Sequence, residues 1–391
     1  MESLQKLQPW RQVQGVYVHI PFCRQKCLYC DFNSYAGFGA DVMAAYAEAV
    51  CAEIAGRKKD VPINSGASIY FGGGTPSLLP VELTAQIVNA LKKCGLWQNP
   101  CEASIEANPG TVDLPKLQAL RQMGFDRISF GVQSLNDAEL QAIGRVHNAE
   151  QALEAVALAK QAGFARINAD VIYGLPGQTM ESLKNTLALL TATGIEHLSV
   201  YGLIVEEGTP LQKLATSGKI TLPDEDAAVD MYEFVQAFLK AQGFERYEIS
   251  NYARGGAYSR HNLVYWHYYP YAAFGAGACG FNGSARFTAA ADVRSYIAAV
   301  QNGAPLYDTE ELDIAVQFEE FMFMNLRKKS GADLIEAKER FGIDVMAKFG
   351  AELAPLIAQK LVAYDAGTQK ICLTEAGMEV GNRIFEIFVT A

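Results

Sequence analysis

The chain has 391 residues, of which half are hydrophobic and 19% are charged, and its formal net charge is −10 at pH 7. This length suits one barrel-sized domain with an appendage, and the composition is ordinary for a globular protein. An acidic chain is a poor candidate for a nucleic-acid partner, because such partners favour a basic surface. The basic run 327–329 therefore reads as a solvated patch. No stretch approaches the ~18 uninterrupted apolar residues of a membrane span, and residues 1–16 lack the apolar core of a signal peptide.

Eight cysteines are too few and too scattered for a disulfide framework in a chain of this length. Three of them, Cys23, Cys27 and Cys30, lie within eight residues, and the other five are dispersed. This usage predicts a reducing compartment, the cytoplasm.

The clustered cysteines follow a short β-branched run, 16–20, which Pro21 ends. Their C-x3-C-x2-C spacing therefore places three thiols on a loop at the carboxyl end of a strand. Close-spaced thiolates suit an iron–sulfur cluster or, less well, zinc, and buried inert cysteines are the remaining alternative. Three thiolates cannot complete a four-iron cubane, so one iron would keep a position open for another ligand.

Strands and helices alternate from this loop to about residue 245. Strands are predicted at 16–20, 68–73, 102–107, 127–134, 166–173 and 197–205, and helices at 41–55, 79–93, 113–123, 149–162, 181–193 and 223–242. Strict alternation implies a parallel sheet with right-handed crossovers. Six units rather than eight predict an open, partial (βα)6 TIM-like barrel, with its chemistry at the carboxyl ends of the strands.

Alternate residues of these strands are polar. Tyr17 and His19 share one face of the first strand, and Ser104 with Glu106, Ser129 with Gln133, and Asn168 with Asp170 do the same later. We therefore expect a polar cavity inside the barrel and apolar packing outside it.

Beyond residue 245 the pattern changes. Residues 247–281 are rich in Tyr, Gly and Asn without a clean period, whereas 316–326 and 333–360 read as helices before a short strand at 369–374 and a final helix. The tail is thus predicted to be a mostly helical, winged-helix-like domain. We divide the chain into an N-terminal segment (1–15), a barrel (16–245), an aromatic and glycine-rich segment (246–310) and a C-terminal domain (311–391).

The cysteine motif behind a first strand resembles the signature of radical S-adenosylmethionine (SAM) proteins, in which SAM chelates the open iron of a [4Fe-4S] cluster. The surrounding Tyr-Val-His-Ile-Pro-Phe-Cys at 17–23 is similar to one branch, which contains oxygen-independent coproporphyrinogen III oxidases and heme chaperones of the HemW type.

The resemblance implies further site residues. Gly73, Gly74 and Thr75 match the family's glycine motif near the methionine amino group, although a simple turn explains such a run equally well. The positions that match other SAM contacts are Tyr17, Glu106, Gln133, Arg145 and Asp170. Each of these alone could be an ordinary polar group of a barrel interior, and His19 either contacts cofactor or hydrogen-bonds inside the barrel.

Two features separate the oxidase from the chaperone. The oxidase motif carries a further cysteine two places beyond the third, where this chain has Phe32. Residues 261–266, His-Asn-Leu-Val-Tyr-Trp, fit the H-N-x-x-Y-W motif associated with heme binding in the chaperones. His261 is then a candidate iron ligand, flanked by aromatic rings that suit a porphyrin. The alternative is an aromatic plug with His261 hydrogen-bonded inside it.

We therefore expect a heme chaperone with a [4Fe-4S] cluster, SAM and heme, whose partner is a heme-acceptor protein of unknown identity. The rival is the oxidase, which uses a SAM-derived radical, and radical modification of RNA or protein is a third, less favoured class. A monomer and a homodimer are both compatible with the sequence.

Overall fold

A twelve-stranded sheet dominates the computed structural model, which describes residues 8–57, 61–304 and 306–389. Residues 1–7 of the predicted N-terminal segment lie outside the described residues. The rest of that segment forms a 3-10 helix, η1 (Pro9–Arg11), and the start of β1 (Val13–Ile20). The first strand thus begins three residues before the predicted Val16, because Val13 already pairs with Ile63 of the next strand.

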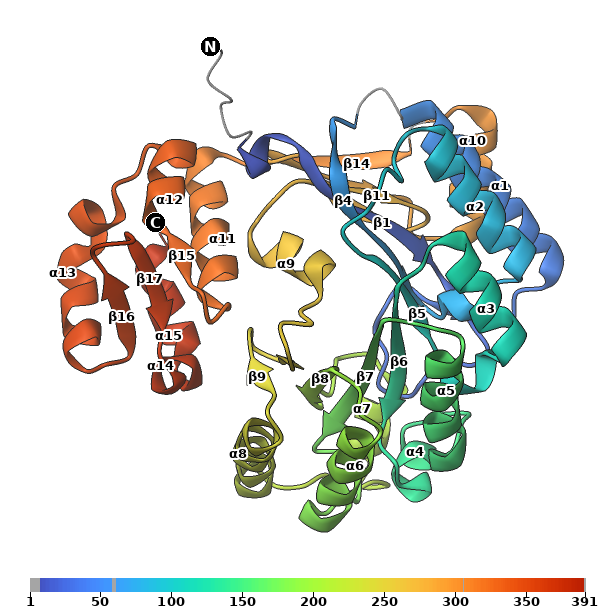
Figure 1. Ribbon diagram of the computed structural model, residues 1–391, viewed down its shortest axis with the longest axis horizontal. Coiled ribbons are helices and arrows are strands. Elements are labelled where there is room, and N and C mark those ends of the chain that lie inside the picture. The colour runs from blue at the N-terminus through green and yellow to red at the C-terminus, as the bar shows by residue number, and fades with distance from the viewer. Residues whose placement is uncertain (1–7, 58–60, 305, 390–391) are drawn as a thin grey trace.

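Seven strands of this sheet run parallel and form the wall of an open barrel (Figure 1). In spatial order they are β11 (Tyr271–Phe274), β1, β4 (Ile63–Gly73), β5 (Ala103–Ala107), β6 (Arg127–Gln133), β7 (Arg166–Tyr173) and β8 (His197–Gly202). The six predicted strands are therefore confirmed, and β11 is an unexpected seventh. Alternation works as expected: in β6, Ile128, Phe130 and Val132 are fully buried under the helices.

The six predicted helices cover the outer face of the barrel (Figure 1), and two short helices that were not predicted, at 137–142 and 210–216, lie beside the cysteine loop. Together these helices are α1 (Ala40–Arg57), α2 (Val81–Lys93), α3 (Leu114–Met123), α4 (Asp137–Ala142), α5 (Ala149–Gln161), α6 (Met180–Ala192), α7 (Pro210–Thr216) and α8 (Glu225–Ala241). Local sequence sets several boundaries: Asn148 and Thr179 cap the amino ends of α5 and α6 with reciprocal capping boxes. Gly124 ends α3 in a left-handed conformation.

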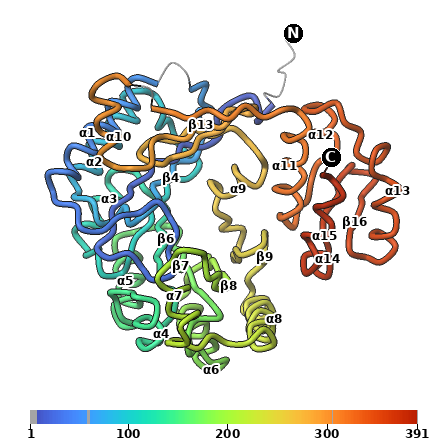
Figure 2. Tube along the Cα trace, turned by 180° about the vertical axis from the view of Figure 1, so that it is seen from behind, coloured from blue at the N-terminus to red at the C-terminus, as the bar shows by residue number. Residues whose placement is uncertain are grey.

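The segment without a clear period extends both edges of the sheet. At one edge β10 (Asn251–Ala253) and β9 (Glu245–Arg246) follow β8, and at the other β12 (Cys279–Phe281), β13 (Ala285–Ala289) and β14 (Tyr307–Glu311) follow β11. Helix α10 (Val293–Asn302) packs against α1. Between the two edges, α9 (Arg260–Trp266) crosses the inner side of the barrel (Figures 1 and 2). Strands of two to five residues are too short to show a sequence period.

The C-terminal region has its own hydrophobic core, built around residues such as Phe318, Phe321 and Leu353. Its helices are α11 (Ile314–Leu326), α12 (Leu334–Phe341), α13 (Val345–Ala358), α14 (Glu375–Glu379) and α15 (Gly381–Phe385), and a small sheet joins β15 (Ala332–Asp333), β17 (Lys370–Leu373) and β16 (Val362–Asp365). The mostly helical, winged-helix-like architecture is thus confirmed. The prediction of helix throughout 333–360 was wrong, because the segment forms two helices. Gly342 ends α12 in a left-handed conformation, and Asp344 caps α13.

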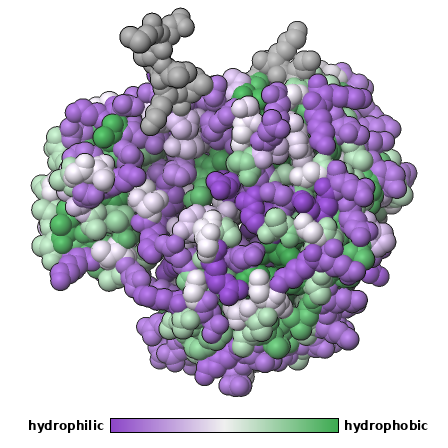
Figure 3. Space-filling model, viewed as in Figure 1, coloured by the Kyte–Doolittle hydropathy of each residue, from purple (hydrophilic) through white to green (hydrophobic). Residues whose placement is uncertain are grey.

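The structure also tests two predictions about the surface, the basic run and the absence of a membrane span. The basic run at 327–329 is a solvated patch only in part: Lys329 is exposed, whereas Lys328 is only 2% exposed and its ammonium donates to His267 and Asn325 at 2.7 Å each. Hydrophilic residues cover most of the face in Figure 3. Across residues 8–57, 61–304 and 306–389, every helix is too short or too polar to cross a membrane.

Candidate functional site

The cysteine loop lies at the carboxyl end of β1 and is closed by the pairing of β2 (Phe22–Cys23) with β3 (Tyr35–Ala36). Lys26 Nζ donates to the Phe32 carbonyl at 2.9 Å, which fixes the loop across its middle. All eight cysteines of the chain are free thiols. The three in this loop, each partly exposed, line one cavity of about 390 Å3, which we call the polar cavity.

Each of the three thiols has its own polar neighbour. Thr75 Oγ1 lies 3.7 Å from the Cys23 sulfur, and Ser34 Oγ lies 3.7 Å from the Cys30 sulfur. The guanidinium of Arg145 donates to the Cys27 sulfur at 3.4 Å. Burial raises the pKa of Cys23, so its thiolate needs a bound cation to persist at neutral pH.

The donor set favours a cluster over a single metal ion. Among the residues that the structure describes, no three His, Cys, Asp or Glu side chains surround one common ion position. A zinc site would need such convergence, whereas in a cubane each thiolate binds a different iron. Three separate free thiols around one cavity therefore fit an iron–sulfur cluster with an open iron.

The glycine run allows β4 to approach the cysteine loop closely. A Cβ on Gly74 would lie 2.9 Å from the Cys23 sulfur and 2.8 Å from the Phe22 carbonyl oxygen. Gly73 has φ +118° and donates its N–H to Glu106 Oε2 at 3.1 Å. Both positions thus need glycine for a structural reason, and both line the polar cavity with Thr75.

Two carboxylates face the same cavity. Glu106 also accepts from the Tyr70 hydroxyl at 2.7 Å, and burial raises the pKa of Glu106 to about 7. Asp170 accepts from Asn168 Nδ2 at 2.7 Å and from Ser129 Oγ at 3.3 Å, and burial raises its pKa as well. Because desolvation disfavours both anions, a cationic ligand entering here would find carboxylates that gain from its charge.

Gln133 and Arg145 complete the predicted group on the β6 side. Gln133 has φ +68° at a register shift between β6 and β7, which turns this side chain toward the cavity. Arg145 donates to Asn108 Oδ1 at 2.5 Å and to the Gly131 carbonyl, while its buried Nε lacks a partner among the described residues. One buried donor thus remains unsatisfied.

Two predicted residues do not line the polar cavity. The Tyr17 hydroxyl hydrogen-bonds to His19 Nδ1 at 2.8 Å, and the Tyr17 ring stacks on Tyr70 with centroids 6.2 Å apart. Tyr70 is the ring that lines the cavity. His19 Nε2 bonds to the Asn33 carbonyl at 2.8 Å, so this imidazole ties β1 to the cysteine loop.

Several cavity residues were missed in the sequence. They are Tyr70, Asn108, Arg127, Ser199 and Tyr201. The alternation that indicated Ser129 and Gln133 extends back to Arg127 and could have found it. Arg127 is 2% exposed, and its Nε has no partner in the described part of the chain. Tyr201 and Asn108 follow from no sequence signal that we identify.

The H-N-x-x-Y-W motif forms helix α9. Ser259 caps its amino end by accepting from the Asn262 N–H at 3.3 Å. The buried carboxylate of Glu102 accepts from the backbone N–H groups of Arg260 and His261 at 3.1 and 3.2 Å. Glu102 also pairs with Arg166 at 2.8 Å, so the positive end of α9 is held on the barrel.

His261 is fully buried inside the barrel rather than open to a cavity. Its Nδ1 is 2.9 Å from Ser68 Oγ, and its Nε2 is 2.8 Å from the Tyr265 hydroxyl. Burial lowers the pKa of His261 to about 3, so the ring is neutral. Its role as an iron ligand stays a prediction, and coordination would require Tyr265 or Ser68 to release a nitrogen.

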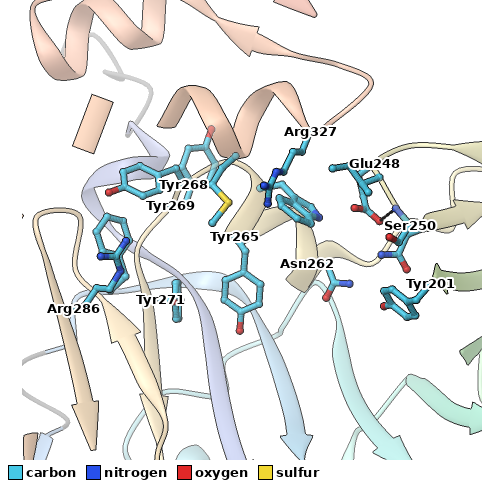
Figure 4. Close-up of a pocket in the computed structure, with 15 residues that line it drawn as sticks. Tyr201, Glu248, Ser250, Asn262, Tyr265, Tyr268, Tyr269, Tyr271, Arg286 and Arg327 are labelled. Carbon is cyan, nitrogen blue, oxygen red and sulfur yellow. Dashed lines mark hydrogen bonds between the residues drawn. The ribbon is translucent and has the colours of Figure 1, made fainter. Parts of the chain in front are cut away.

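Tyr265 and Trp266 line a second cavity of about 590 Å3 between the barrel and the C-terminal region, which we call the aromatic cavity (Figure 4). Its other rings are Tyr201, Tyr268, Tyr269, Tyr271 and Phe281, and its polar side chains are Glu248, Ser250, Asn251, Asn262, Arg286 and Arg327. Tyr201 and Asn262 line both cavities, which therefore adjoin. A volume of this size is typical of organic ligands and cofactors.

Comparisons with known proteins agree with this architecture. The model of the radical SAM superfamily matches residues 17–190, and that of the HemN C-terminal domain matches residues 312–380. Among solved structures, the chain is similar to coproporphyrinogen III oxidase (HemN) from Escherichia coli, a radical SAM enzyme. The TM-score is 0.82 at 25% identity, covering 98% of this chain and 91% of that one.

Curated relatives match at higher identity and over nearly their whole length. The chain is 36% identical to the heme chaperone HemW of Lactococcus lactis, over 96% of this chain and 97% of the relative. It is 34% identical to the heme chaperone HemW of Bacillus subtilis, over 96% and 99%. The radical SAM superfamily implies a [4Fe-4S] cluster and SAM. With the partial barrel, three free thiols at its mouth and relatives matched from end to end, the chain belongs to the HemW family of radical SAM proteins.

Proposed function

We propose that this protein is a heme chaperone, which binds heme beside a SAM-ligated [4Fe-4S] cluster and passes it to an acceptor protein. The observation that best supports this proposal is the aromatic cavity, because it adjoins the polar cavity and is large and apolar enough for a porphyrin. The name shared by the curated relatives supports the same function.

In this proposal Cys23, Cys27 and Cys30 hold the cluster, which supplies an open iron for SAM. Arg145 stabilises the Cys27 thiolate through its 3.4 Å contact. The residues proposed to bind SAM line the polar cavity: Gly73, Gly74, Thr75, Glu106, Gln133, Arg145 and Asp170. Tyr17 contributes indirectly, because its ring stacks on the cavity-lining ring of Tyr70. Glu106 and Asp170 favour the cationic cofactor because their own charges are poorly compensated in its absence.

Heme occupies the aromatic cavity against α9. Tyr265 is the residue between His261 and this cavity, since its hydroxyl bonds Nε2 while its side chain lines the wall. A rotation of Tyr265 would expose Nε2 toward the iron. The low pKa of His261 keeps the imidazole in the neutral form that can coordinate a metal.

The division of labour follows the four predicted segments. Residues 16–245 form the radical SAM barrel, 246–310 the heme-binding segment, and 311–391 a C-terminal domain that closes the aromatic cavity through Met324 and Arg327. Two of the predicted boundaries shift in the structure: residues 13–15 already belong to β1, and β11 of the 246–310 segment pairs with β1 in the barrel wall. We further propose that the protein works in the reducing cytoplasm, consistent with its eight free thiols.

The competing function is oxidation of coproporphyrinogen III, favoured by the likeness to E. coli HemN. Against it stands Phe32, whose ring is 66% exposed and lines the polar cavity where the oxidase motif has a cysteine. A phenyl ring supplies neither a thiol ligand nor redox chemistry.

One anaerobic experiment separates these functions. The reconstituted protein is titrated with heme by absorbance and, separately, incubated with SAM, a reductant and coproporphyrinogen III. We expect stoichiometric heme binding, a Soret band that changes in His261→Ala, and no vinyl product. His147→Ala is the matched control, because that histidine lies on the β6 side, bonded to the Val132 carbonyl. Vinyl product without heme binding would replace the chaperone with the oxidase.

A further inference from the structure

The aromatic cavity contains two guanidinium groups that differ in their partners. Arg286, on β13, forms ion pairs with Glu310 at 3.0 Å and with Glu320. Arg327, directly after α11, makes no side-chain hydrogen bond or ion pair with any residue in the described ranges, and its buried Nε lacks a partner. Its guanidinium rests over the Phe385 ring at 5.5 Å. One cation of the cavity is thus neutralised and the other is not.

An unpaired guanidinium in such a wall is costly unless something binds it, because partial burial removes water without providing an acceptor. Among the described residues, Glu248 is the carboxylate that lines the aromatic cavity with Arg327; it is 1% exposed and accepts from the Ser250 N–H at 3.2 Å (Figure 4). Burial raises the pKa of Glu248, which favours its uncharged form. No ion pair or hydrogen bond joins Glu248 to Arg327 within the described residues, so Glu248 leaves the guanidinium without a counterion.

We propose that Arg327 binds a carboxylate of the molecule that occupies the aromatic cavity. This inference rests on the proposed function, and for heme the group is one of the two propionates. The planar fork of a guanidinium matches a carboxylate with two parallel hydrogen bonds. Arg327 thereby fixes which edge of the porphyrin faces the C-terminal domain, while the rings of Tyr265 and Trp266 contact its faces. Arg286 contributes little, since two glutamates already satisfy it.

The test compares heme with its dimethyl ester, which keeps the macrocycle and iron but has no propionate charge. Both are titrated into the reconstituted full-length protein, wild type and variants, by Soret absorbance. We expect wild type to bind heme roughly tenfold more tightly than the ester, the value of one charge-assisted hydrogen-bonded pair. Arg327→Gln should bind the ester as wild type does and lose most of this preference. Arg327→Lys should recover part of it.

Arg383→Gln is the matched control, because Arg383 is an exposed cation of the same domain that lines the neighbouring cavity but not the aromatic one. It should keep the full preference. Equal weakening of heme and ester in Arg327→Gln, or an unchanged preference, would refute the carboxylate contact while leaving heme binding intact. Failure of wild type to bind either porphyrin would instead refute the proposed function, and this inference with it.

Discussion

The polar and aromatic cavities share Tyr201 and Asn262 but are built in opposite ways. The polar cavity is assembled from strand ends of one parallel sheet, and its groups already hydrogen-bond one another, as Glu106 does with Tyr70 and Gly73. The aromatic cavity joins side chains from the barrel, α9 and α11, and the hydroxyls of Tyr265, Tyr268 and Tyr269 bond to His261, Glu320 and Glu336, which lie outside the cavity lining. A charged cofactor site is thus preorganised by the sheet, whereas the large apolar site depends on how the C-terminal region packs.

Removing a cluster ligand should have the largest effect and tests whether the polar cavity holds the iron–sulfur cluster. Cys27→Ala should abolish the oxygen-labile visible absorbance and nearly all bound iron after anaerobic reconstitution, because a cluster held by two thiolates has no third anchor. Folding should persist, since the thiol belongs to a loop outside the hydrophobic core. Cys101→Ala, at an exposed thiol distant from the loop, is the control. Iron retained at the wild-type level in Cys27→Ala would contradict the ligand assignment.

A second change acts within the polar cavity. Glu106→Gln should weaken SAM binding by roughly ten- to a hundredfold, because it removes an anion that a cationic ligand would compensate. Equilibrium dialysis with the reconstituted protein measures the effect. Heme affinity should be unchanged, because Glu106 does not line the aromatic cavity. A similar loss of both ligands would show that the two cavities do not act separately.

The reciprocal change lies in the aromatic cavity. Trp266→Ala should weaken heme binding by roughly tenfold, since a large apolar contact is lost, while cluster content and SAM affinity stay at wild-type values. Soret titration and iron analysis of the same preparation provide both readings. Unaltered heme affinity would place the porphyrin elsewhere.

The last expected effect leaves ligand binding aside and concerns the dependence of stability on pH. The pKa of Glu106 is about 7 in the folded protein against an ordinary 4.5, so folding favours its protonated form. The cluster-free protein should therefore lose unfolding free energy as pH rises from about 4.5 through about 7, by about 3 kcal/mol from this group. In urea titrations from pH 5 to 8, Glu106→Gln should lack this part of the decline. Parallel curves for the two proteins would mean that the carboxyl titrates normally.

Much of the barrel could be predicted from the sequence, because its strands, its cysteine loop and its helix ends are each marked by residues close together in the chain. The polar side of β6 and β7 follows from alternation, and the cysteine spacing after β1 follows from the order of residues alone. Capping residues such as Asn148 and Thr179 mark helix starts within a few positions. The division of 333–360 into two helices was also present, in Gly342, but hydrophobic periodicity concealed it.

What only the tertiary structure decided depends on contacts between distant segments. The sequence placed His261 beside aromatic residues, but it could not show that Ser68, 193 positions earlier, and Tyr265 occupy both ring nitrogens. Nor could it show that Arg327 has no counterion in the described part of the chain while Arg286 has two, since Glu310 and Glu320 come from different elements. Residue order determines which groups a strand or helix presents. Whether a charge is satisfied or a ring is enclosed is determined by the side chains that folding brings from elsewhere in the chain.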